Sequence, residues 1–185
     1  MHGPCSTAGG SLKCPEWPTL PKVPILDTVA PVLDSERAEI WRRQRGVMLD
    51  KWKACGLRFP VTEDNPEKYP KLDPDTMGDA EGLAEAMVYG RLRLMVTPTK
   101  LGGTIEAFGD WRNGGGLAAF KMGPAFWNQN PWNRAYLLTH ETGHALGLNH
   151  WPQFDNNKSV MNGDARVSIY PIAHDLDSLG SYYDL

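Results

Sequence analysis

The 185-residue sequence lacks a long apolar run, an excess of basic charge and a C-x-x-C cysteine pair. No apolar run approaches the roughly 18 residues of a membrane-spanning helix, so we expect no membrane span. Nineteen lysines and arginines against 22 aspartates and glutamates give a formal net charge of -3, which argues against nucleic-acid binding. The three cysteines, Cys5, Cys14 and Cys55, cannot all pair within one chain and do not indicate a thiol metal site.

Composition and length predict one globular domain with an irregular extension. Hydrophobic residues make up 41% of the chain and charged residues 22%, as in ordinary folded domains. Residues 1–33 contain six prolines, and we expect them to form an irregular N-terminal extension before a domain over residues 34–185. The first residues show no charged segment followed by an apolar one, so no signal peptide is visible.

Apolar periodicity predicts alternating strands and helices. Asp34 or Ser35 is placed to cap a helix that Gly56 ends, because apolar residues recur between them at helical spacing. We predict a long surface loop over residues 63–82. We predict strands at Leu57–Thr62, Leu92–Thr97, Thr104–Trp111 and Leu117–Met122, a helix at about 133–147 capped by Asn133, and a short helix at roughly His174–Tyr183.

Three of the five histidines fall between positions 140 and 150, in the pattern H-E-x-x-H-x-x-G-x-x-H. His140 and His144 share one helix face, because positions four apart are neighbours on a helix. Gly147 permits a left-handed turn that ends the helix and brings His150 to the other two. Three neutral imidazoles suit Zn²⁺ and leave a fourth tetrahedral position for water.

Glu141 lies about 100° round the helix axis from His140, so it can reach the open side of the metal without binding it. Chance would produce the whole pattern in on the order of 1 in 10⁴ such chains. We therefore interpret His140, His144 and His150 as the ligands of one catalytic zinc ion. Glu141 is the predicted general base of a hydrolase.

The pattern resembles the extended signature of the metzincin metallopeptidases, and its wording H-E-x-G-H-A-L-G-L-x-H is most similar to that of the matrixins. Metzincins carry a methionine in a tight turn beneath the metal. The resemblance assigns this role to Met161, in a turn at about 159–163. The stretch from Pro171 is similar to the final helix of matrixins, with Asp175 and Tyr183 at matching positions.

The resemblance implies an α+β fold of the zincin type. Its parts would be a twisted mixed sheet with an edge strand over the cleft, a backing helix, an active-site helix and a C-terminal helix. It also implies a secreted, monomeric zinc endopeptidase whose protein or peptide substrate adds to the edge strand. We assign this edge to Leu117–Met122, with Ala118, Ala119 and Phe120 as substrate contacts, and place Tyr170 beside the substrate pocket.

Calcium is not supported by the sequence. Asp110, Asp155 and Asp164 could offer oxygen ligands, but isolated loop aspartates are usually solvated turn residues. Two other functions stay open. One is a zinc-binding interaction module that reuses a peptidase cleft, against which the presence of Glu141 argues. The other is an amidase acting on cell-wall peptides, which would use the same site.

Overall fold

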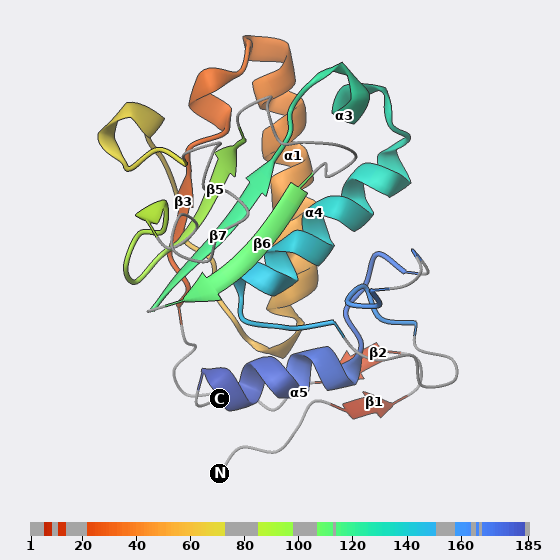
Figure 1. Ribbon diagram of the computed structural model, residues 1–185. Coiled ribbons are helices and arrows are strands. Elements are labelled where there is room, and N and C mark those ends of the chain that lie inside the picture. Colours follow the sequence, from red (N-terminus) through yellow and green to blue (C-terminus); the bar gives the residue numbers. More distant parts are fainter. Residues whose placement is uncertain are drawn as a thin grey trace.

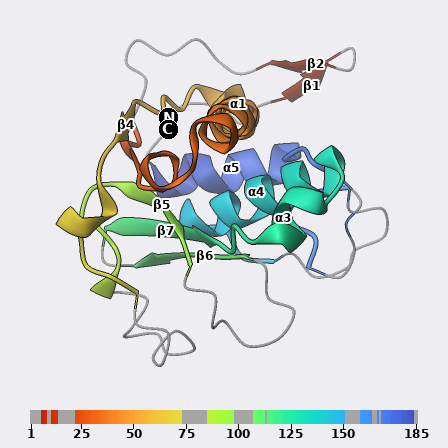
Figure 2. The ribbon, with the colours of Figure 1, turned by 90° about the horizontal axis from the view of Figure 1, so that it is seen from above.

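The computed structural model describes residues 6–8, 11–13, 22–72, 85–97, 107–112, 114–150, 158–163, 166 and 168–183. Its centre is a five-stranded mixed sheet (Figure 1), formed by β3 (Ile25–Asp27), β4 (Val61–Glu63), β5 (Leu92–Val96), β6 (Ala107–Arg112) and β7 (Gly115–Phe120). The strand order is β4-β3-β5-β7-β6. The first four strands are parallel, and β6 pairs antiparallel with β7 at one edge. Seen from above, β6 is the strand farthest from helix α1 (Figure 2).

The long helices are α1 (Ser35–Trp52), α4 (Pro131–Ala145) and α5 (Ala173–Tyr182). In Figure 1, α5 crosses below α1 and α4, at the opposite end of the molecule from α3. Within the described part of the chain, no helix is long and apolar enough to cross a membrane. The shorter elements are α3 (Pro124–Asn128), the 3-10 helices η1 (Ala30–Val32), η2 (Lys53–Cys55) and η3 (Pro66–Lys68), and a hairpin of β1 (Ser6–Ala8) and β2 (Ser11–Lys13).

Helix α1 confirms the prediction of a helix that starts after Asp34. The Asp34 carboxylate accepts a hydrogen bond from the Arg37 backbone N–H at 2.9 Å and so satisfies one of the free donors of the first turn. Trp41, Met48 and Trp52 are buried in the core that α1 shares with α4 and the sheet. The Trp41 ring lies 5.6 Å from that of Phe120 on β7. Helix α1 is therefore the backing helix of the sheet.

The predicted N-terminal extension is too long, because residues 25–27 form an inner strand of the sheet. Ile25 pairs with Val61 on one side and with Leu92 on the other, and it is buried. Pro24 is tolerated because it precedes the strand, where only its carbonyl is needed, and this carbonyl accepts a hydrogen bond from Leu92 N at 2.9 Å. The boundary at residue 33 is therefore wrong for residues 22–33.

The predicted edge strand Leu117–Met122 is also wrong. It corresponds to β7, which pairs with β5 on one side and with β6 on the other. Ala118, Ala119 and Phe120 are completely buried, so their side chains cannot contact a substrate. A run of small and apolar residues is typical of a strand covered on both faces, which is where β7 lies. The edge strand on this side of the sheet is β6, which overlaps the strand predicted at Thr104–Trp111.

Candidate metal centre

Helix α4 carries two of the three predicted zinc ligands. It begins one turn earlier than predicted, because Asn130, not Asn133, is the cap: the Asn130 side chain accepts a hydrogen bond from Asn133 N at 2.8 Å. Pro131 follows at the first helical position, where its missing N–H costs nothing. His140 and His144 lie one turn apart near the end of this helix. Both rings therefore come from the most regular element of the site.

The turn after α4 brings His150 to the other two histidines. Gly147 has a φ of 102°, a left-handed conformation that a side chain would strain. Leu148 N then donates to the carbonyl of Gly143 at 3.0 Å, which folds the chain back along the helix end. A Cβ at Gly163 would lie 2.9 Å from the His150 ring, so this glycine leaves the ring its space. The predicted role of Gly147 is confirmed.

The three ring nitrogens have the spacing that a tetrahedral metal requires. The Nε2 atom of His150 lies 3.0 Å from that of His140 and 3.0 Å from that of His144, and the remaining pair is 3.2 Å apart. With Zn–N bonds of about 2.0–2.1 Å, two tetrahedral donor nitrogens are about 3.3 Å apart. Among the described residues, this is the group of histidine, cysteine and acidic side chains whose donor atoms converge in this way.

Hydrogen bonds on the far side of two rings prepare their Nε2 atoms for a cation. His140 Nδ1 donates to the carbonyl of Val160 at 2.7 Å, and His144 Nδ1 donates to the carbonyl of Leu148 at 2.7 Å. A neutral ring that carries its proton on Nδ1 has a lone pair on Nε2. Burial lowers the pKa of His140 to about 4, so its ring is neutral at pH 7. Nε2 lone pairs that converge with 3.0–3.2 Å between the nitrogens fit a cation at their centre.

A turn at residues 159–163 lies directly under α4. Met161 is completely buried, and a Cβ at Gly143 would overlap its sulfur and lie 2.9 Å from Trp52. Met161 N donates to Ser159 Oγ at 2.8 Å, and the Ser159 hydroxyl donates to the Asp175 carboxylate at 2.6 Å. The turn is thus fixed from α5 below and packed against α4 above, next to His144.

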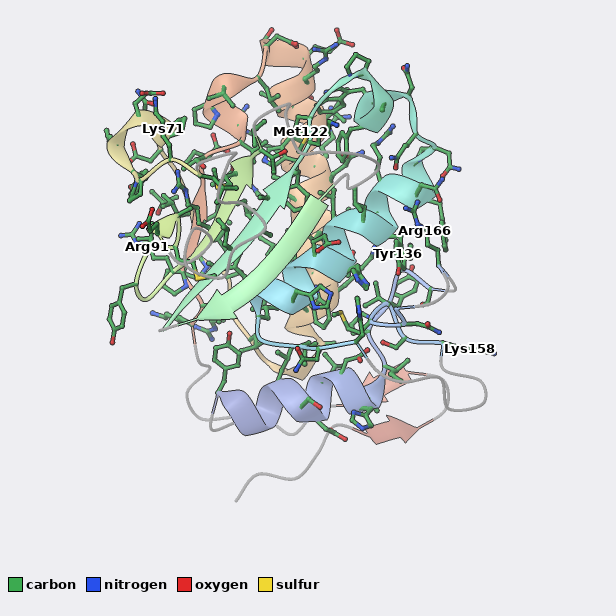
Figure 3. All side chains as sticks on the ribbon, in the orientation of Figure 1. Lys71, Arg91, Met122, Tyr136, Lys158 and Arg166 are labelled. Carbon is green, nitrogen blue, oxygen red and sulfur yellow. The ribbon has the colours of Figure 1, made fainter. Side chains whose placement is uncertain are left out.

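Tyr136 is a site residue that the sequence analysis missed. Its ring stacks on that of His140 with centroids 5.3 Å apart, and its hydroxyl donates to the carbonyl of Asn162 at 3.1 Å. The guanidinium carbon of Arg166 lies over the Tyr136 ring, 5.5 Å from the ring centroid. Figure 3 shows the two side chains next to each other. Tyr136 lies four residues before His140, the same helical spacing that relates His140 to His144, and this is the signal that could have found it.

Comparisons with known proteins support the fold. No protein-family model and no curated protein matches the sequence. Among solved structures, the chain is similar to the crystal structure of archaemetzincin from Methanopyrus kandleri, with a TM-score of 0.50 and 17% sequence identity. The match covers 90% of this chain and 97% of the archaemetzincin chain. The fold is archaemetzincin-like. At this identity the similarity shows the fold alone, so any conclusion on function rests on the site.

The structure does not decide the roles of the remaining predicted residues. Glu141 lies half-buried on α4 beside His140, and its role as general base stays a prediction. Tyr170 is 60% exposed, and its ring lies 5.3 Å from the Lys51 Nζ of α1. Its contact with substrate also stays a prediction. The closer resemblance to matrixins within the metzincins is likewise untested by the structural comparison.

Proposed function

We propose that the protein is a zinc-dependent endopeptidase. The observation that carries this proposal is the convergence of three histidine Nε2 atoms within 3.0–3.2 Å of one another, on an archaemetzincin-like fold. His140, His144 and His150 would hold the ion. When bound, zinc supplies a Lewis acid that polarises a carbonyl and makes a water molecule more acidic.

The protein's own residues would supply the orientation and the proton transfers. The carbonyls of Val160 and Leu148 fix the ring orientations of His140 and His144, so that both Nε2 lone pairs point to one place. Glu141 would accept a proton from the attacking water and pass it to the leaving amine. Its position on α4, one residue after His140, supports a role in which the carboxylate would lie near the metal without being a fourth protein ligand.

The edge strand β6 is the candidate element for holding the substrate. It is antiparallel to β7 and forms one edge of the sheet, so within the described residues its outer side has no strand partner. An extended peptide can add to such an edge through main-chain hydrogen bonds. We therefore transfer the proposed peptide-binding role from Leu117–Met122 to Ala107–Arg112 and expect protein or peptide substrates.

The substitution Glu141→Gln tests the proposed reaction. It keeps the size of the side chain and the three histidines but removes the base, so we expect unchanged zinc content by elemental analysis and a loss of at least about 10²-fold in cleavage of a fluorogenic peptide library. The matched control is Glu67→Gln, at an exposed carboxylate on η3 that pairs with Lys71. If Glu141→Gln cleaved peptides at the wild-type rate, the general-base role would be wrong. If wild-type protein bound zinc but cleaved nothing in the library, the interaction-module alternative would be favoured.

A further inference from the structure

A groove lies along α1, and none of the three histidines lines it. It consists of two cavities of about 500 Å³ and 210 Å³ that share Val47 and Lys51 in their walls. We call it the α1 groove. Tyr170 and Pro171 line the larger cavity, and Pro131, Ala135 and Thr139 of α4 line the smaller one. Much of its wall is apolar, and Val47 is 55% exposed within it although it lies in the middle of a helix.

Two residues that line the α1 groove each carry a buried polar atom with no hydrogen-bond partner within the described structure. The atoms are Gln44 Oε1, an acceptor, and Lys51 Nζ, a donor. The two residues are seven positions apart on α1, so they lie on one helix face with about 10.5 Å between them along the axis. An unpaired buried polar atom costs free energy comparable to a lost hydrogen bond, which a ligand of matching chemistry would recover.

The charge of the α1 groove favours an anion at Lys51. Its other charged residues already have partners, because Arg43 pairs with Glu39, and Asp50 pairs with Lys53 at 2.6 Å. The Lys51 ammonium lies 5.3 Å from the centre of the exposed Tyr170 ring, and burial lowers the Lys51 pKa. The groove therefore has one uncompensated positive charge at the Tyr170 end and an unused acceptor at the other end.

We propose that the α1 groove binds the C-terminal end of an extended peptide. The free carboxylate would pair with Lys51, and a backbone N–H about three residues earlier would donate to Gln44, since an extended chain rises about 3.3 Å per residue. Apolar side chains between these two points would cover Val47. Gln44 favours a peptide over a simple fatty acid, because an acceptor needs a donor in the ligand. This proposal does not depend on the proposed peptidase activity.

Binding can be measured with an N-acetylated tetrapeptide of apolar residues, as the free acid and as the C-terminal amide. The full-length Glu141→Gln protein with zinc is used, so that the peptide is not consumed. We expect the acid to bind at least about tenfold more tightly than the amide, because a hydrogen bond between charged groups contributes more than one between neutral groups. Chemical shifts should change at Val47, Lys51 and Tyr170.

Lys51→Met tests the anchor without creating a cavity. It should weaken binding of the acid at least about tenfold while the melting temperature stays the same or rises, because an apolar side chain replaces an unpaired buried charge. The control Lys71→Met removes an equal charge at an exposed residue paired with Glu67 and should bind as before. Gln44→Met should weaken the acid by a few fold.

Three outcomes would overturn the proposal. The first is equal affinity for the acid and the amide. The second is a set of chemical-shift changes confined to His140, His144 and His150, which would place the carboxylate at the metal centre. The third is binding of decanoate that Lys51→Met abolishes, with no binding of the peptide acid, which would make the α1 groove a fatty-acid site.

Discussion

At the scale of single residues, Tyr136 links His140, the first proposed zinc ligand, to the turn beneath it. Its hydroxyl lies 3.3 Å from His140 Nδ1 and donates to Asn162 O, while its ring stacks on the histidine. The same His140 nitrogen bonds to the Val160 carbonyl of that turn. Tyr136 is therefore a positioning residue, which restricts the His140 ring from a second direction and is not part of the converging histidine group.

Tyr136→Phe should lower zinc affinity about fivefold, because it removes one neutral hydrogen bond of about 1 kcal/mol while keeping the stacked ring. The affinity is measured by competition with a chromogenic chelator. Tyr89→Phe is the matched control, since Tyr89 is 86% exposed and lies before β5. An unchanged zinc affinity in Tyr136→Phe would contradict a positioning role. Tyr136→Ala should have a larger effect, because it also removes the stacked ring.

The convergence of the three histidines could be predicted from the sequence because their spacing is local. His140 and His144 lie one turn apart on α4, and the turn at Gly147 that brings in His150 follows directly after this helix. The groups that orient the rings could not be predicted. The Val160 carbonyl is twenty positions from His140 in sequence, and a backbone carbonyl leaves no signal in residue types.

At the scale of elements, the close contact of α4 with the turn and with α1 depends on Gly143. A Cβ there would overlap the Met161 sulfur and approach Trp52 to 2.9 Å. Gly143→Ala should therefore destabilise the protein by about 1–3 kcal/mol, as overpacking does, and lower the melting temperature by about 2–12 °C in calorimetry.

Gly46→Ala is the matched control for this prediction. Gly46 lies inside α1 and has no atom within 4 Å of an added Cβ, so the higher helix propensity of alanine should raise stability by up to about 1 kcal/mol. The same substitution should thus have opposite signs on the two helices. Equal effects at both positions would show that helix propensity, and not the contact with Met161, decides the result at Gly143.

A cluster of charges joins α1 to the sheet at β4. Hydrogen bonds from Arg42, assisted by Arg45, lower the pKa of Glu63 to about 2, from an ordinary value of 4.5. Because the folded state holds this proton less tightly, the stabilisation is present above about pH 4.5 and is lost as the pH falls towards 2. The pair is partly exposed, so we expect its contribution to be about 1 kcal/mol at most.

Glu63→Gln should flatten the acid limb of the stability curve. Urea unfolding at several values between about pH 5 and pH 2 should show a smaller loss of stability than in the wild type, because one depressed carboxylate no longer titrates. The control is Glu39→Gln, which removes the carboxylate of the exposed Glu39–Arg43 pair on α1. It should leave the acid limb close to that of the wild type. Parallel curves for the wild type and Glu63→Gln would refute the link.

The elements of the sheet were predicted less well than the helices. The predicted strand Leu92–Thr97 is confirmed as β5, because five consecutive residues there have little competing turn chemistry. Strand β3 was missed because its three residues stand among prolines, and three residues give too short a pattern to show a period. The prediction that β7 lies at the sheet edge was wrong because β6 pairs with it on its outer side. Which strands pair with each other depends on the tertiary structure and is not visible in the sequence of a single strand.

At the scale of the whole molecule, α5 connects the separate parts of the metal centre. Asp175 accepts from the Ser159 hydroxyl of the turn and from Ile172 N at the start of α5, at 2.6 Å and 2.7 Å. At the other end of α5, the Tyr183 hydroxyl donates to the carbonyl of Leu146, just beyond α4. Both residues stand at positions where the sequence resembles the final helix of matrixins. The C-terminal helix therefore supports the turn and the end of α4 together.

Zinc should stabilise the whole molecule, because its ligands come from α4 and from the segment beyond it. At a zinc concentration about a thousandfold above the Kd, linkage adds about 4 kcal/mol to the free energy of unfolding. For a chain of this size that corresponds to a rise in melting temperature of about 8–16 °C, which calorimetry with and without a chelator would show.

The histidine substitutions decide whether this stabilisation arises at the triad. His150→Ala removes one of three ligands and should reduce the zinc-dependent rise in melting temperature to a few degrees at the same zinc concentration. His174→Ala removes an exposed histidine of α5 that is outside the triad, and should keep the full rise. A full rise in His150→Ala would mean that zinc binds elsewhere on the chain.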